Sequence, residues 1–319
     1  EYVIINMKES RNFKIDVIKG LGITLVVWGH AVGVGNLVIY SFHMPLFFLL
    51  SGLFYKPKAN FIKNRFKRLV VPFLAYNVLF VILSYLCGTF DVLCNNFSIF
   101  NISAFDGPTW FLVALFILSC IYWIIDRTIN KKCLKVVVCC GIGLIGCYVK
   151  KPLPLYITQA LCCLPFFALG NCFPKSILLT KSKYIGMCFL IYIGVLYYCF
   201  ETNTRVDIYS LMFTGQPILF YIGAFSSIAL VFALGFIDKK NGINKTLSVI
   251  GNNSLEIMAL HYPFIALICT NIRSQFVFLG GVGEAIASHL ITFLIVLYIP
   301  LFMVLGIKKY VTSIKEYEK

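Results

Sequence analysis

The chain has 319 residues, of which 60% are hydrophobic and only 13% are charged, with a mean hydropathy of +0.87. Soluble domains carry roughly 25% charged residues, so this composition excludes an ordinary soluble protein and indicates an integral membrane protein. The formal net charge of +15 needs its own explanation.

About ten apolar segments approach the roughly 20 residues that a transmembrane helix needs. They lie at 15–38, 40–55, 69–87, 109–126, 134–149, 154–172, 184–200, 216–237, 247–271 and 285–306. The first segment runs directly into the second, which predicts a retained span and not a cleaved signal peptide. We therefore predict an all-α polytopic membrane protein in which 1–319 form one membrane domain, with 1–14 and 307–319 as cytosolic ends.

The positive charges indicate how these segments are oriented. If the amino terminus is inside, all but four of the 28 Lys and Arg residues belong to the inner side, the exceptions being Lys150, Lys151, Arg205 and Arg273. Cytoplasmic loops carry such an excess, so both termini are predicted to be cytosolic. Because the bases are dispersed over loops that face anionic lipid headgroups, the net charge requires no nucleic acid partner.

The first segment carries Asp16, Lys19 and His30. Lys19 and His30 are eleven positions apart, which places both on one helix face, roughly 16 Å from each other. Charged groups inside a span are costly and usually functional, and an imidazole suits general acid and base chemistry. Two alternatives stay open: Asp16 and Lys19 can form an intrahelical ion pair, and His30 can be a packing residue.

The second segment contains His43 near its start and ends in Phe47-Phe48-Leu49-Leu50-Ser51-Gly52. Ser51 and Gly52 allow a backbone or a ligand to approach closely, although helix packing explains them equally well. Arg65 and Arg68 follow, one helical turn apart, in a basic cluster. Their guanidinium groups match phosphate oxygens and predict a site for a phosphorylated cytosolic cofactor, with a topological anchor as the alternative.

Two later places carry further candidates for substrate binding. Trp110 begins the fourth segment, where an interfacial aromatic anchor is the simpler explanation. Glu256 and His261 lie in the ninth segment, five positions apart, so they need not face one cavity. The longest predicted outer loops, 88–108 and 201–215, are rich in Asn, Ser, Thr and Asp and can face an external substrate or simply be solvated.

Other motifs carry no chemistry. The 13 cysteines lie mostly in apolar segments, without a CxxC pair, and are predicted to be core thiols. The four histidines show no HxxxH spacing, so no metal site is predicted. Gly141, Gly143 and Gly146 match GxGxxG in letters but lack the strand and acidic residue of a dinucleotide fold.

Over essentially its whole length the chain resembles the acyltransferase-3 membrane proteins, bacterial enzymes that O-acylate cell-envelope carbohydrates. The resemblance rests on the basic residue and histidine Lys19 and His30, on the Phe47 to Gly52 run, and on Arg65-Phe66-Lys67-Arg68. It also includes Trp110-Phe111-Leu112 and the stretch from Ser254 to Pro263. The resemblance implies a multi-pass protein of the bacterial cytoplasmic membrane.

It also implies an O-acyltransferase, most often an O-acetyltransferase, that moves an acyl group from cytosolic acyl-CoA to a glycan or lipid-linked sugar outside. Arg65 and Arg68 are expected at the CoA phosphates, with Lys19 and Ser51 along the donor path. His30 is expected to act as general base or transient acyl carrier, with Asp16 and Lys19 beside it. Trp110, His43, Glu256 and His261 are expected near the acceptor.

Two other classes of protein compete with this interpretation. A transporter for a small polar or anionic solute would also have about ten spans and intramembrane Lys19, His30 and Glu256. An inverted repeat would favour it, and none is evident. A non-enzymatic membrane sensor would show no dependence on acyl-CoA at all.

Overall fold

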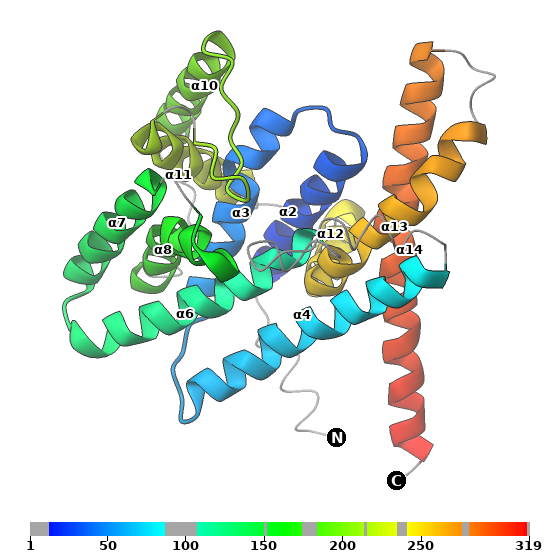
Figure 1. The fold of residues 1–319 in the computed structure, drawn as a ribbon, viewed down its shortest axis with the longest axis horizontal. Helices are drawn as coiled ribbons and strands as arrows, with labels where there is room; N and C mark the ends of the chain where they lie inside the picture. Colours follow the sequence, from blue (N-terminus) through cyan, green and yellow to red (C-terminus); the bar gives the residue numbers. More distant parts are fainter. Residues whose placement is uncertain are drawn as a thin grey trace. The chain divides into compact units, whose positions relative to one another are not determined.

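The computed structural model describes residues 13–86, 107–149, 152–173, 184–213, 216–234, 241–275 and 281–317. Side chains at 234, 266–275, 281–284 and 314–317 are not described. The predicted amino-terminal segment up to residue 12, and the predicted outer loop as far as 106, lie outside the described residues. Within them the chain is helical apart from turns and one isolated antiparallel bridge between Asp207 and Met212, which confirms the all-α prediction there (Figure 1).

The chain divides into two compact units, which we describe separately. The first combines residues up to Val34 with those from Val231 onward. Its helices are α2 (Phe13–Ala31), α12 (Gly242–Asn252), α13 (Ser254–Gln275) and α14 (Gly281–Tyr317). Both α12 and α13 pack on α2, and α14 packs on α13 and α2, so α2 is the centre of this unit.

The second unit comprises residues 35–230. Its helices are α3 (Asn36–Leu53), α4 (Phe61–Leu86), α6 (Trp110–Thr128), α7 (Lys132–Tyr148), α8 (Ile157–Cys172), α10 (Ile185–Glu201) and most of α11 (Pro217–Leu234), with short 3-10 turns at Gly107–Thr109 and Pro154–Tyr156. Helix α8 packs against α3, α6 and α7, while α4 packs on α6.

Five helical stretches among the described residues are long and apolar enough to cross a membrane. They are Asn36–Leu53, Phe61–Leu86, Gly107–Thr128, Pro154–Cys172 and Ala285–Ser313. Helix α2 is similar in length but contains Lys14, Asp16 and Lys19. The predicted ten spans and their orientation stay predictions.

Two predicted boundaries are wrong. The first segment ends at Ala31 and not at 38, because Gly33 and Gly35 adopt positive φ values of 75° and 78°, which end the helix. The ninth segment is two helices that meet at Asn253. Helix α14 continues to Tyr317, past the start of the predicted cytosolic end at 307, and the location of that end stays a prediction.

Glycines bring two pairs of helices into backbone contact. A methyl group added at Gly20 of α2 would overlap the carbonyl oxygen of Leu247, and one at Gly251 of α12 would overlap that of Asp16. Gly52 of α3 and Gly170 of α8 meet the opposing backbones in the same way. Small residues permit such close approach between membrane helices, so these contacts fix α2 on α12 and α3 on α8.

Candidate functional site

Two histidines from distant parts of the sequence meet inside the first unit. The rings of His30, at the end of α2, and His261, in α13, lie edge to face with centroids 5.2 Å apart. The ring of Tyr262 is also near His30, and the centroids of these two rings are 6.0 Å apart. The structure therefore brings together two of the predicted site residues that the sequence placed in separate segments.

The environment of His261 determines its protonation pattern. Its side chain is fully buried, and its Nδ1 lies 3.0 Å from the carbonyl oxygen of Ile257. A carbonyl only accepts hydrogen bonds, so Nδ1 carries the proton and Nε2 of the neutral ring is an acceptor. Within the described residues this Nε2 has no hydrogen-bond partner. A buried acceptor of this kind is available to a donor that enters the site.

Asp16 and Lys19 form the intrahelical ion pair that was one of the alternatives. The Lys19 ammonium lies 3.7 Å from the Asp16 carboxylate, whose side chain is almost completely buried. The carbonyl of Asp16 also faces Gly251, so this turn of α2 is held against α12. Lys19 is thus positioned by Asp16, eleven residues before His30 on the same helix.

Whereas His261 contacts His30, Glu256 binds a lysine of α14. Its carboxylate accepts a hydrogen bond from the Lys308 ammonium at 2.8 Å, and the same ammonium donates to the side-chain oxygen of Asn253 at 2.6 Å. Lys308 of α14 therefore stabilises the junction between α12 and α13 through these two hydrogen bonds. Glu256 therefore has a structural partner in Lys308. The two predicted residues of α13 have different neighbours, since His261 contacts His30.

The predicted donor residues lie on α4 in the second unit. Arg65 is partly buried, with its guanidinium carbon 5.6 Å from the centroid of the Phe61 ring, whereas Arg68 is exposed. Ser51 donates to the carbonyl oxygen of Phe47 in its own helix at 2.8 Å. The Gly52 contact with α8 is the helix-packing alternative recognised in the sequence.

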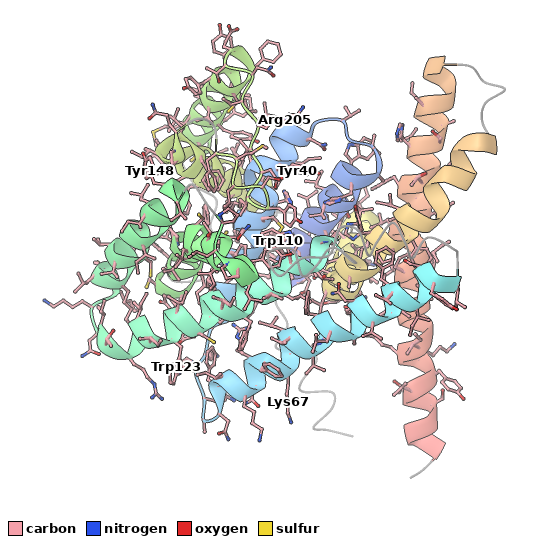
Figure 2. The ribbon with its side chains drawn as sticks, viewed as in Figure 1. Tyr40, Lys67, Trp110, Trp123, Tyr148 and Arg205 are labelled. Carbon is pink, nitrogen blue, oxygen red and sulfur yellow. The ribbon has the colours of Figure 1, made fainter. Side chains whose placement is uncertain are left out.

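Trp110 is buried and not an interfacial anchor on the surface. It is 5% exposed, and its ring centroid lies 5.9 Å from Tyr156 and 5.8 Å from Tyr209. Figure 2 labels it at the start of α6. Tyr156 adopts a φ of 59°, an uncommon conformation for an aromatic residue, so the surrounding packing holds this turn in place.

His43 is also buried in the second unit. Its Nδ1 lies 2.8 Å from the carbonyl oxygen of Ile39, and its ring centroid is 5.1 Å from that of Tyr40. This contact satisfies one ring nitrogen within α3 itself.

Sequence patterns assigned no role to three residues that position the site of the first unit. Gly20 and Gly251 set the contact between α2 and α12, and Lys308 fixes the α12–α13 junction. Small residues inside apolar segments are the available signal for the two glycines. No sequence pattern indicated the role of Lys308, which was used only as one of the positive charges predicted on the inner side.

Apolar helices that contain a histidine pair, with His261 fully buried, and the buried carboxylate of Asp16 are typical of a multi-pass membrane protein with polar groups in its interior. A family model described as an acyltransferase domain matches residues 12–306. The chain belongs to the acyltransferase-3 family, and its activity is therefore acyl transfer. No curated protein and no solved structure matches it. The family match spans residues of both units.

Proposed function

We propose that the protein is an O-acyltransferase that moves an acyl group, most simply acetyl, from cytosolic acyl-CoA to a hydroxyl of a bacterial envelope glycan or lipid-linked sugar. The observation that carries the proposal is the contact between His30 and the fully buried His261. An imidazole beside a second, neutral imidazole provides both the proton acceptor and the hydrogen-bonding partner that this reaction requires.

In the first route His30 acts as general base. A ring nitrogen of His30 takes the proton of the acceptor hydroxyl while the oxygen attacks the thioester carbonyl. The tetrahedral intermediate then expels the CoA thiolate, which recovers the proton from the imidazolium. The products are a sugar ester and CoA, and His30 returns to its neutral form.

In the second route His30 carries the acyl group. Its nitrogen attacks the thioester, CoA leaves as the thiol after taking up the imidazole proton, and an acyl-imidazole remains. The acceptor hydroxyl then attacks this acyl group, and its proton passes to the His30 ring nitrogen as the carbon–nitrogen bond breaks. The products are the sugar ester and neutral His30.

Arg65 and Arg68 are assigned to the phosphates of CoA, with Lys19 and Ser51 along the path of its pantetheine arm. The exposed Arg68 is suited to meet a ligand from solution, while the partly buried Arg65 is held by Phe61. Trp110 and His43 are assigned to the acceptor side. Ten spans with both termini in the cytosol would give transfer the direction from cytosolic donor to external acceptor.

The test is transfer by the purified protein in liposomes. Isotope-labelled acetyl-CoA is supplied with envelope glycan, and both free CoA and labelled glycan are measured. Stoichiometric release of CoA and ester formation supports the proposal. Solute flux without CoA release would instead indicate a transporter, and mass spectrometry of envelope polysaccharides with and without the gene would identify the acceptor.

A further inference from the structure

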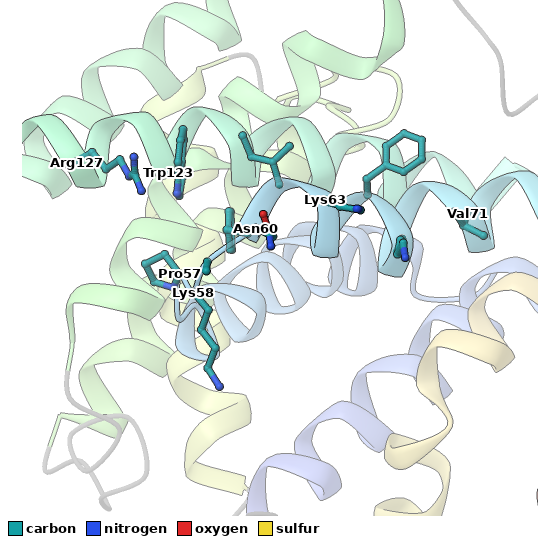
Figure 3. Close-up of a pocket in the computed structure, with 12 residues that line it drawn as sticks. Pro57, Lys58, Asn60, Lys63, Val71, Trp123 and Arg127 are labelled. Atoms are coloured by element: carbon teal, nitrogen blue, oxygen red, sulfur yellow. The ribbon is translucent and has the colours of Figure 1, made fainter.

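A second site lies between α4 and α6, within the second unit. It is a pocket of about 940 Å³, formed by the loop before α4, the first turns of α4 and the last turns of α6 (Figure 3). Neither Arg65 nor Arg68 lines it. The pocket therefore is not explained by the donor site proposed above.

Cations from three elements line this pocket. Lys58 comes from the loop, Lys63 and Lys67 from α4, and Arg127 from α6. Among the described residues, none of these four has a carboxylate partner. The neighbouring acid, Asp126, instead binds Tyr55 and Lys135. The pocket consequently presents uncompensated positive charge, which favours an anionic ligand.

The remaining walls of the pocket are apolar and aromatic. They include Ile62, Phe66, Val71 and Trp123, and the ring of Trp123 lies 4.1 Å from the guanidinium carbon of Arg127. This stacking holds the Arg127 side chain at the pocket. A free inorganic anion would use the cations alone, whereas the apolar walls fit a ligand that also carries hydrocarbon.

The pocket continues into an exposed apolar face of α4. On a helical wheel Lys63, Lys67 and Val71 fall within the same arc of about 100° as the apolar residues of later turns. Those residues are 40% or more exposed and comprise Leu74, Val78, Ile82 and Tyr85. From Lys67 to Val78 the helix rises about 16 Å, close to the ~15 Å of hydrocarbon in one bilayer leaflet.

We propose that this pocket binds the headgroup of an anionic phospholipid, whose acyl chains lie along the exposed face of α4. The headgroup lies in the part of the pocket lined by Lys63 and Lys67, with Arg127 adding to the positive charge, and the first methylene groups pass Val71. The order of groups along the helix, cations followed by exposed apolar side chains, matches a phospholipid from headgroup to tail. Basic pockets between membrane helices bind anionic headgroups in this manner.

The position of Trp123 in the pocket permits a direct test on the full-length protein in nanodiscs. Phospholipids with brominated acyl chains quench the fluorescence of tryptophans that they contact. We expect brominated phosphatidylglycerol, at low mole fraction, to quench more strongly than brominated phosphatidylcholine. Trp123→Phe should abolish this difference, since Trp28 and Trp110 lie outside the pocket.

Charge removal supplies the decisive comparison. Lys63→Gln with Lys67→Gln should weaken the binding of phosphatidylglycerol, so that the concentration needed for half of the quenching rises about tenfold. The matched control, Lys245→Gln with Lys309→Gln, removes two exposed lysines of the other unit and should leave it unchanged. Equal quenching by both lipids, or equal loss in both variant pairs, would overturn the proposal. Protection of Trp123 by free CoA would also overturn it, in favour of a nucleotide.

Discussion

His30 of α2 and His261 of α13 face one another with ring centroids 5.2 Å apart and ring planes at 87°. Since Nδ1 of His261 is committed to the Ile257 carbonyl, its Nε2 is the only nitrogen available to His30 or to a substrate. His261 can therefore only accept a hydrogen bond through Nε2, and among the described residues none donates to it.

Two substitutions at His261 separate the roles of its nitrogens. In His261→Gln the terminal amide group lies near the position of Nε2, whereas in His261→Asn it lies near Nδ1. If Nε2 positions His30, the Asn variant should lose about 100-fold in kcat and the Gln variant distinctly less. Equal activity of both variants, at equal thermal stability, would show that the ring only fills space.

The glycine contact between α2 and α12 should resist even one methyl group. Gly20→Ala and Gly251→Ala each force a Cβ into an opposing backbone and should destabilise the protein by about 1–3 kcal/mol. Thermal unfolding in detergent measures the effect. The control is Gly306→Ala in α14, where a Cβ meets nothing within 4 Å. This control should be neutral or stabilising, because alanine favours the helix.

Lys308 and Glu256 should behave as a structural pair. The Lys308 side chain is 52% exposed, so the pair should contribute no more than about 1 kcal/mol. We expect Lys308→Gln and Glu256→Gln to lower the unfolding temperature slightly and non-additively, with the acceptor KM unchanged. An increase in KM confined to Glu256→Gln would instead show that Glu256 contacts the acceptor.

The donor site and the lipid pocket should be separable on α4. Arg68→Gln should weaken acyl-CoA binding roughly tenfold without loss of stability, because it removes one charge-assisted hydrogen bond from an exposed position. Lys63→Gln with Lys67→Gln should leave acyl-CoA affinity unchanged. Calorimetric titration with CoA measures the affinity of both variants. If the lysine variant loses affinity and Arg68→Gln does not, the nucleotide binds in the pocket.

Local sequence patterns predicted much of the fold but not its long-range contacts. The placement of Asp16, Lys19 and His30 on one helix follows from helical periodicity, and the Asp16–Lys19 pair from their spacing of three. The contact of His30 with His261 could not be predicted, since it depends on how α13 packs against α2. The break at Asn253 falls in the polar run Gly251-Asn252-Asn253-Ser254, a turn signal that was passed over because apolar residues continue on both sides of it.

The central claim is that His30 performs the acyl transfer. Its most direct test is the rate of CoA release by purified His30→Gln protein, with acetyl-CoA and envelope glycan present and with thermal unfolding as the check on folding. We predict a loss of at least about 100-fold relative to the unsubstituted protein, as expected when a general base or nucleophile is removed. A correctly folded His30→Gln protein that releases CoA at the original rate would contradict the account.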